Sequence, residues 1–364
     1  MDDYNRRVGA AMGRGAYRSA VEAAGILQRC RKKIADLLKA EDPERIVFTF
    51  NGTDSLNVAL HGLLQSGDHV ITSVLEHNSV VRPLSELRLK KGIEITRVGT
   101  DAAGKVDPAE FQRALRPQTK LIALIHASNV TGTVQPIADV GTIARKAGVL
   151  FLVDAAQTAG HLPIDISTLP VDMLACPGHK GLLGPLGTGV LYLGPGIEKR
   201  LTSHRQGGTG THSEDDAQPE TIPDKFESGN HNAPGLAGLE AGVSWLHERG
   251  IAEIHRHEQA LVSKLLEGLS GIPGLRIYGS MLDDVRVGVV SLAVDGFDPH
   301  DVSAILDQTF GIETRAGLHC AAGVHRAMGS FQLGGTVRLS IGPFTILEDV
   351  AHAVDALQQI AGAT

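Results

Sequence analysis

Short apolar segments alternate along the first 200 residues with stretches of mixed polar and apolar character. The apolar segments are rich in Val, Ile, Leu and Phe and hardly alternate with polar residues, as is typical of strands that are buried on both faces. They occupy residues 46–50, 69–74, 121–127, 149–155 and 188–193. Strands that alternate with helices predict βαβ units and a mostly parallel sheet with helices on both faces.

The remaining sequence predicts long helices, a long polar loop and a second α/β unit. Residues 206–224 are polar and contain Gly and Pro, which favours a long loop outside the core. Helical patterns occur at 19–40, 234–247, 252–269, 299–309 and 347–361, and strand-like segments at 285–294 and 336–341. We therefore expect a large domain over residues 1–240 and a small domain over 241–364.

Composition excludes several classes of function. The chain has 364 residues, a net charge of −7 and no basic face that stands out, which argues against nucleic acid and anionic membranes as partners. No segment approaches the ~20 apolar residues of a membrane span. The three cysteines, Cys30, Cys176 and Cys320, are odd in number and widely spaced. This pattern argues against a disulfide framework and predicts a reducing, cytoplasmic location.

Polar residues follow the predicted strands at their carboxyl ends, where open α/β sheets bind ligands. The first strand runs into 51-NGTDS-55, whose amides at a helix start would suit a phosphate, although an ordinary helix cap is the simpler alternative for this motif alone. The other candidates at strand ends or in the following turns are His77, Asn129, Asp154, Gln157 and Lys180. A buried carboxylate such as Asp154 is costly unless it is paired or bound to a ligand.

The order of these motifs resembles a known family. The chain contains NGT, EHNS, SNVTG, VDAAQ, GHK, RAGLHC and VRLSIG in that order. The series resembles the class V aminotransferase group of pyridoxal-phosphate (PLP) enzymes and, within it, the cysteine desulfurases. The resemblance extends from about residue 10 to the end. It implies PLP-dependent transferase fold type I, an α/β fold with a mostly parallel seven-stranded sheet between helices and a small C-terminal α/β domain. It also implies a homodimer and an N-terminal segment that packs toward the small domain.

The resemblance assigns a role to each residue at the strand ends. Lys180 would form the Schiff base with PLP and remove the Cα proton of the substrate, and Asp154 would pair with the pyridinium nitrogen. His77 would stack on the ring and move protons. Gln157 and Asn129 would bond the ring's 3-oxygen, and Asn129 would also touch the substrate. Gly52 and Thr53 would hold the phosphate, and no metal is implied.

Two positions depart from the family pattern around the phosphate. Pro177 stands where relatives carry Ser or Thr, and it has neither a hydroxyl nor an N–H. Asn230, in 228-SGNHN-232, replaces the Thr that reaches the neighbouring subunit's phosphate. Phosphate binding would therefore depend more on His179 and the amides of 52–54. Relatives also begin with a strand and a turn that line the substrate pocket, so we expect either a missing start or a more open pocket.

The reaction that we expect depends on the role of Cys320. It lies in 315-RAGLHCAAG-323, where His319, Arg315 and Arg326 would favour its thiolate. A buried structural thiol is the alternative, which we assign to Cys30 and Cys176. Arg338, in the VRLSIG motif, would clamp the substrate carboxylate, a bidentate task that suits arginine.

The leading hypothesis is an L-cysteine desulfurase, which leaves a persulfide on Cys320 for a sulfur-acceptor protein and releases L-alanine. The alternative is a lyase acting on selenocysteine or cystine, or another eliminating or transaminating PLP enzyme. A non-catalytic scaffold is disfavoured because Lys180, Asp154, His77 and Cys320 are all retained. A nucleotide-binding module is disfavoured because the chain has no G-x-x-x-x-G-K-[ST] motif.

Overall fold

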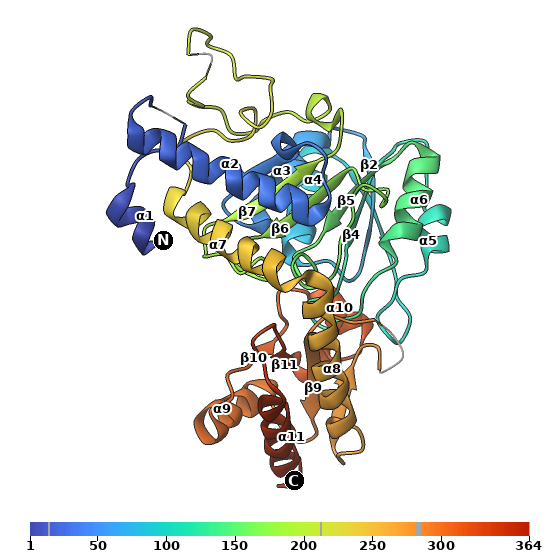
Figure 1. Ribbon diagram of the computed structural model, residues 1–364. Coiled ribbons are helices and arrows are strands. Elements are labelled where there is room, and N and C mark those ends of the chain that lie inside the picture. The colour runs from blue at the N-terminus through green and yellow to red at the C-terminus, as the bar shows by residue number, and fades with distance from the viewer. Residues whose placement is uncertain (14, 212, 282–284, 364) are drawn as a thin grey trace.

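The computed structural model describes residues 1–13, 15–211, 213–281 and 285–363. It has a large α/β part in the upper half of Figure 1 and a small α/β part below it. The N-terminus lies beside the large part, and the C-terminus lies at the far end of the small part.

Seven strands form the large sheet, in the order β1-β7-β6-β5-β4-β2-β3. Strand β7 runs antiparallel to both of its neighbours, and the other pairs are parallel. The strands are β1 (Ile46–Thr49), β2 (His69–Ser73), β3 (Glu94–Val98), β4 (Thr119–Ile125), β5 (Leu150–Asp154), β6 (Met173–Pro177) and β7 (Gly189–Leu193). The mostly parallel sheet predicted from the sequence is confirmed. Five of its strands, β1, β2, β5, β6 and β7, are buried along their whole length, which explains why their sequences do not alternate.

Helices cover both faces of this sheet. One face packs against α2 (Arg18–Leu38), α5 (Pro108–Arg113), α6 (Ile137–Ala147) and α7 (Ala233–Arg249). The other face packs against α3 (Gly52–Leu63) and α4 (Asn78–Lys91). Because α3 and α4 begin directly after β1 and β2, their N-termini lie at the carboxyl edge of the sheet.

The small domain has its own sheet and its own core. Its antiparallel strands are ordered β10-β11-β9-β8, namely β10 (Arg315–Gly317), β11 (Thr336–Ser340), β9 (Val289–Val294) and β8 (Leu275–Tyr278). Helices α8 (Ile251–Leu269), α9 (Pro299–Phe310) and α11 (Leu347–Ala361) pack around this sheet. The short helix α10 (Ala322–Ala327) follows Cys320 and packs Val324 into the large core.

Helix α8 carries the chain from one core to the other. Ile254, in its first turn, packs into the large core, whereas Leu261 and the apolar residues after it pack into the small core. The preceding helix α7 packs against α2, in the large domain. Gly250 separates the two helices with a φ of +84°, which favours glycine. We therefore place the junction within α8, later than the boundary expected near residue 240.

Four strands lie outside the predicted segments: β6 is internal in the large sheet, and β3, β8 and β10 are edge strands. Strands β3 and β8 are partly exposed and contain charged residues, and β10 has only three residues. Edge strands have no neighbour on one side, so they carry a weaker apolar signal. The strand expected at 285–294 begins only at Val289, and residues 282–284 lie outside the described residues. Val287 instead donates a backbone hydrogen bond to Gly132 in the large domain.

The N-terminal segment packs on the large domain, and the expectation that it packs toward the small domain is wrong. Helix α1 (Asp2–Arg7) contacts α7, and the buried side chains of Tyr4 and Met12 join the large core. The long polar loop predicted at residues 206–224 contains no helix or strand in its described residues 206–211 and 213–224. Figure 1 shows it as an extended loop at the end of the molecule opposite the small domain. None of the described helices is long and apolar enough to cross a membrane.

Candidate active site

The residues predicted at the strand ends meet around one cavity. It has a volume of about 510 Å³, within the ~300–1,000 Å³ that is usual for small-molecule sites. Eight predicted residues line it: Gly52, Thr53, His77, Asn129, Asp154, Gln157, His179 and Lys180. They lie at or just after the carboxyl ends of five different strands, β1, β2, β4, β5 and β6, so the fold brings together residues that are distant in sequence.

The other three predicted site residues line neighbouring cavities. Arg338 lines one that shares Lys180, His77, Asn129 and Gln157 with the first. Cys320 lines another, which shares His77, Thr53 and Ser79 with the first. Asn230 lines a smaller cavity that shares only Gly187 with the first. Within one chain, Asn230 therefore does not face Lys180.

Lys180 lies in the turn after β6 and is accessible from the cavity. The glycines beside it allow close backbone packing. A Cβ atom on Gly178 would lie 2.1 Å from Thr188 Oγ1, and one on Gly181 would lie 2.3 Å from the carbonyl oxygen of Ala159. Partial desolvation of the amine at the cavity wall lowers the pKa of Lys180, while Asp154 acts in the opposite direction. An amine with a lowered pKa is a better nucleophile and base at neutral pH.

Asp154 ends strand β5 and is 3% exposed. Its Oδ1 accepts a hydrogen bond from the amide of Ala156 at 3.0 Å. Burial raises the pKa of this carboxyl, and it forms no ion pair with another described residue. A buried carboxylate of this kind suits a ligand that brings its own N–H. The pyridinium nitrogen of PLP is such a group.

The start of α3 offers free amides to the same cavity. Asn51 caps the helix by accepting from the amide of Asp54 at 2.9 Å, whereas the amides of Gly52 and Thr53 have no acceptor in the described part of the chain. Gly52 packs closely on Pro177, since a Cβ atom on Gly52 would lie 3.0 Å from Pro177 Cδ. Free amides at a helix start bind anions. This cradle and Asp154 together fit PLP.

A chain of hydrogen bonds links Thr53 to His77 through Ser79. Thr53 Oγ1 lies 2.7 Å from Ser79 Oγ, which in turn lies 2.8 Å from His77 Nδ1. The Ser79 amide also donates to Nδ1, so this nitrogen carries no proton. Burial, together with Lys180 and nearby arginines, lowers the pKa of His77 to about 4. His77 is therefore neutral at pH 7. Sequence reasoning missed Ser79, although the EHNS motif contains it.

Two arginines stand side by side at the cavity edge of the small domain. Arg315 and Arg338 are direct partners in the pairing of β10 with β11. Arg338 Nη1 donates to the carbonyl oxygen of Asn129 at 3.1 Å, and neither guanidinium forms an ion pair with another described residue. Burial lowers the pKa of Arg338, and Arg315 lowers it further. Two adjacent cations without an acidic partner form a site for an anion, such as a carboxylate.

Cys320 lies on a tight turn after β10. Its Sγ accepts a hydrogen bond from Arg315 Nη2 at 3.3 Å, and its carbonyl oxygen accepts from the amide of Asn78 at 2.8 Å. Both His319 and Cys320 have left-handed backbone conformations, with φ of +49° and +59°. Such conformations are uncommon outside glycine and often mark functional turns. The turn holds the half-buried thiol close enough to Lys180 and Arg338 to influence the pKa of both.

The other groups expected around the Cys320 thiol point elsewhere. His319 is 2% exposed, and its Nε2 lies 3.0 Å from Thr336 in the small domain. Arg326 lies over the ring of Phe331 at 4.3 Å. Arg315 is therefore the cation that contacts the thiol among the three neighbours predicted from the sequence.

The two remaining cysteines are sealed in the large core. Cys30, on α2, is 0% exposed, and Cys176, in β6, is 1% exposed. Burial raises the pKa of each thiol to about 12. Neither thiol is therefore ionised near neutral pH.

The segment that carries Asn230 is anchored by a buried ion pair. Glu227, whose side chain is 3% exposed, forms a bidentate pair with Arg31 at 2.8 Å and accepts from the amide of Phe48 at 2.6 Å. Although burial alone would raise the pKa of Glu227, Arg31 and the hydrogen bond with His231 at 2.7 Å together lower it to about 2. Asn230 itself is exposed, three residues after this anchor.

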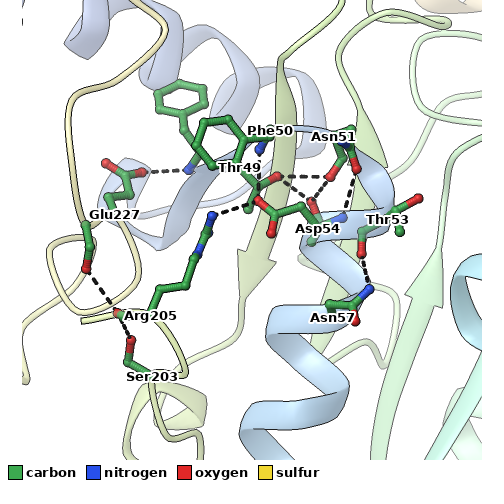
Figure 2. A network of polar contacts seen from close by, with 12 residues as sticks. Thr49, Phe50, Asn51, Thr53, Asp54, Asn57, Ser203, Arg205 and Glu227 are labelled. Carbon is green, nitrogen blue, oxygen red and sulfur yellow. Dashed lines mark hydrogen bonds and ion pairs between the residues drawn. The ribbon is translucent and has the colours of Figure 1, made fainter. Parts of the chain in front are cut away.

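Figure 2 shows how the same region reaches the start of α3. Arg205 Nη1 lies 3.3 Å from Asp54 Oδ2, which also accepts from the amide of Phe50 at 3.0 Å. Ser228 Oγ donates to the carbonyl oxygen of Arg205 at 3.1 Å. Arg205 thus connects the Asn230 segment to the first turn of the anion cradle.

Comparison with known proteins agrees with this geometry. The family model described as "Aminotransferase class-V" matches residues 1–352. The chain belongs to the class-V aminotransferase family. A probable cysteine desulfurase from Methanothermobacter thermautotrophicus is 38% identical over 367 residues, which cover 100% of this chain and 90% of the relative. A probable cysteine desulfurase from Pyrococcus abyssi is 35% identical, covering 99% of this chain and 89% of the relative.

Solved structures of class-V aminotransferase proteins share the fold. The apo cysteine desulfurase from Thermococcus onnurineus NA1 superposes with a TM-score of 0.92 at 34% identity, covering 100% of this chain and 90% of that one. The cysteine desulfurase CsdA (S-sulfonic acid) from Escherichia coli superposes with a TM-score of 0.89 at 28% identity, covering 100% of this chain and 91% of that one. The class-V fold predicted from the motifs is confirmed.

Proposed function

We propose that the protein is a PLP-dependent L-cysteine desulfurase that transfers the sulfur of its substrate to Cys320. The observation that carries the proposal is the position of the Cys320 thiol. It is bonded to Arg315, whose strand partner Arg338 lines the same cavity as Lys180. A thiol and an anion site from the small domain thus face a lysine and a buried carboxylate from the large domain. The relatives named cysteine desulfurase support the same activity.

The residues of the large domain fit PLP. When bound, PLP supplies an electron sink that weakens the bonds at the substrate Cα. Lys180 would hold the cofactor through its amine and move the Cα proton, which its lowered pKa favours. Asp154 would accept the ring N–H, and Asn129 and Gln157 would bond the 3-oxygen. His77, a neutral imidazole at pH 7, would stack on the ring.

The phosphate site uses more groups than the sequence indicated. The amides of Gly52 and Thr53 and the Thr53 hydroxyl form its base. Ser79 adds a second hydroxyl beside Thr53, which compensates for the hydroxyl that is missing at Pro177. His179 lines the cavity, and burial followed by the charge of Lys180 lowers the pKa of its imidazole. We propose that His179 contacts the cofactor as a neutral side chain.

The small domain binds the substrate and takes its sulfur. Arg338 and Arg315 hold the α-carboxylate, which places the substrate side chain toward Cys320. The Cys320 thiolate attacks the substrate sulfur, a new S–S bond forms and the substrate C–S bond breaks. The carbon side then gains a proton to give L-alanine. L-Cysteine and one Cys320 thiol thus yield L-alanine and one Cys320 persulfide, which is passed to an acceptor protein.

We propose that two copies form the working unit, in the cytoplasm. Asn230 does not line the Lys180 cavity of its own chain, yet it lies on a firmly anchored, exposed segment. A second copy would place this amide at the neighbouring phosphate. A dimer of this kind needs a total interface above ~2,000 Å². The cytoplasmic assignment follows from the three free thiols.

One experiment tests the function. Protein loaded with PLP is incubated with L-cysteine, and alanine, sulfide and pyruvate are quantified. A desulfurase gives alanine and a protein persulfide, whereas a β-eliminating lyase gives pyruvate and ammonia. Borohydride reduction should fix the cofactor on the peptide that contains Lys180, and Lys180→Ala should abolish turnover. Pyruvate as the main product, or a label on another lysine, would overturn the proposal.

A further inference from the structure

A second buried polar pair lies at the edge of the Lys180 cavity. His161 Nδ1 lies 2.9 Å from Glu258 Oε1 and 3.1 Å from Oε2. The Glu258 side chain is 1% exposed, and His161 is its hydrogen-bond partner within the described residues. Since a carboxylate only accepts, Nδ1 of His161 must carry the proton of this bond. A buried carboxylate that depends on one donor is costly to leave without it.

The pair joins the two domains at the point where α8 changes core. His161 belongs to the large domain, seven positions after Asp154 in the segment that follows β5. Glu258 lies on α8, between Ile254, which packs into the large core, and Leu261, which packs into the small core. Figure 1 shows the start of α8 at the junction between the two parts.

His161 also packs directly against the Lys180 turn. A Cβ atom on Gly181, the residue after Lys180, would lie 2.5 Å from Cδ2 and 2.7 Å from Nε2 of His161. His161 lines the same cavity as Lys180 and Arg338, and its side chain is 19% exposed there. One imidazole therefore contacts the turn of Lys180 with one edge and holds α8 with the other.

We propose that His161 and Glu258 are positioning residues that fix the small domain relative to Lys180. The inference rests on the proposed function, because it treats Arg338 and Cys320 as the small-domain half of the site. The two halves of that site meet only if α8 keeps its place on the large domain. Hydrogen bonds to charged groups are geometrically specific, which suits this task better than apolar packing.

The inference separates two properties of the protein. Cofactor binding uses large-domain groups, such as Lys180, Asp154 and the α3 cradle, so loosening the link should leave it unchanged. Binding of the substrate carboxylate uses Arg338, so loosening the link should raise KM. A loss of general stability would change both properties together.

Three variants and one control test the link. His161→Ala removes the donor, and Glu258→Gln keeps the size of the side chain but removes its charge. His161→Asn places an amide N–H close to the position of Nδ1 and should restore the link. The matched control is His257→Ala, also on α8, because His257 Nε2 bonds the carbonyl oxygen of Thr345 within the small domain. KM for L-cysteine, cofactor absorbance, cofactor affinity and melting temperature are measured for each variant.

We expect KM to rise about tenfold in His161→Ala, the factor for one hydrogen bond to a charged group, and by less in Glu258→Gln. Both variants should keep the wild-type cofactor affinity and spectrum, and His161→Asn and His257→Ala should keep the wild-type KM. Hydrogen exchange, which needs no turnover, should become faster at the start of α8 and at 180–184 in the first two variants. It thus tests the link even if the wild-type protein produces no alanine and the proposed function fails.

Unchanged KM and unchanged exchange in both His161→Ala and Glu258→Gln would overturn the inference. A KM in His161→Asn as high as in His161→Ala would overturn it as well, because His161 would then act through Nε2. If His161→Ala does not fold, Glu258→Gln alone carries the same comparison.

Discussion

Arg315 donates a hydrogen bond to the Cys320 thiol at 3.3 Å, while its neighbour across the strand pair, Arg338, bonds the carbonyl oxygen of Asn129 at the substrate cavity. Adjacent and chemically identical side chains thus have different partners. We therefore expect different roles for the two arginines. Arg338 binds the substrate carboxylate alone, whereas Arg315 binds the carboxylate and also holds the Cys320 thiol.

The two arginines should therefore differ in their kinetic effect. Arg338→Ala removes a charge-assisted contact to the carboxylate, so kcat/KM should fall about 10- to 100-fold, mainly through a higher KM. Arg315→Ala should lower kcat for alanine formation as well, because the thiol loses its donor. Steady-state kinetics of alanine release measures both effects. If Arg315→Ala changes KM alone, Arg315 serves only the carboxylate.

The fate of Cys320→Ala distinguishes a desulfurase from a lyase. Both enzymes need Lys180 and the cofactor for the first steps, but only the desulfurase needs a protein thiol to take the sulfur. Cys320→Ala should keep the spectral change on adding L-cysteine and lose both alanine and the protein persulfide. L-Selenocysteine serves as a control, since its selenol leaves more easily. Full activity of Cys320→Ala on L-cysteine would exclude the desulfurase mechanism in favour of the lyase.

The strand ends were predictable because a polar residue after a buried apolar strand is conspicuous in sequence, as Asp154 is after β5. The pairing of Arg315 with Arg338 was not, because β10 has three residues and too little pattern to indicate a strand. Ser79 was missed for a different reason. Its hydroxyl gains significance from Thr53, which lies 26 positions earlier and meets it only in the fold.

The domain junction was misplaced because two amphipathic helices follow each other almost without interruption. The sequence shows Gly250 between α7 and α8 but does not show which core each helix joins. That choice depends on tertiary packing, in which Ile254 and Leu261 on one helix enter different cores. The link between His161 and Glu258 was likewise invisible, since the two residues are 97 positions apart.

The hydroxyl of Ser79 should raise PLP affinity by more than the missing hydroxyl at Pro177 lowers it. Ser79→Ala removes a hydroxyl beside Thr53, and one neutral hydrogen bond is worth about 0.5–1.5 kcal/mol, so PLP affinity should fall about two- to tenfold. Because Ser79 compensates for the hydroxyl missing at Pro177, Pro177→Ser should leave PLP affinity unchanged, whereas Asn230→Thr restores a hydroxyl and should tighten PLP. Equilibrium titration of apoprotein with PLP measures these changes. Weaker PLP in either gain-of-hydroxyl variant would contradict this account of the phosphate site.

The buried pair of Glu227 and Arg31 should make stability depend on pH in acid. The folded pKa of Glu227 is about 2, against 4.5 for the free group. A depressed pKa means that the stabilisation is fully present above pH 4.5 and is lost as pH falls toward 2. Glu227→Gln should remove this dependence and cost about 3–5 kcal/mol at pH 7, because Arg31 is left buried without its partner.

Denaturant unfolding at several pH values measures this effect. The matched control is Asp36→Asn, which breaks the exposed pair with Lys32 on the same helix α2. Exposed pairs contribute at most about 1 kcal/mol, so this variant should unfold almost as the wild type does. Equal destabilisation by the two variants would show that the buried pair contributes no more to the free energy of unfolding than the exposed pair does.

Because Cys30 and Cys176 are buried in the core, Cys320 is the cysteine that a thiol reagent can reach in the native protein. With both core thiols protonated near neutral pH, a thiol-specific reagent should modify the native chain at Cys320 alone. The mass of the intact labelled chain would then report directly whether that position carries a free thiol, a persulfide or neither. Sulfur could be followed through each turnover on the natural sequence, with no cysteine removed to make the measurement clean.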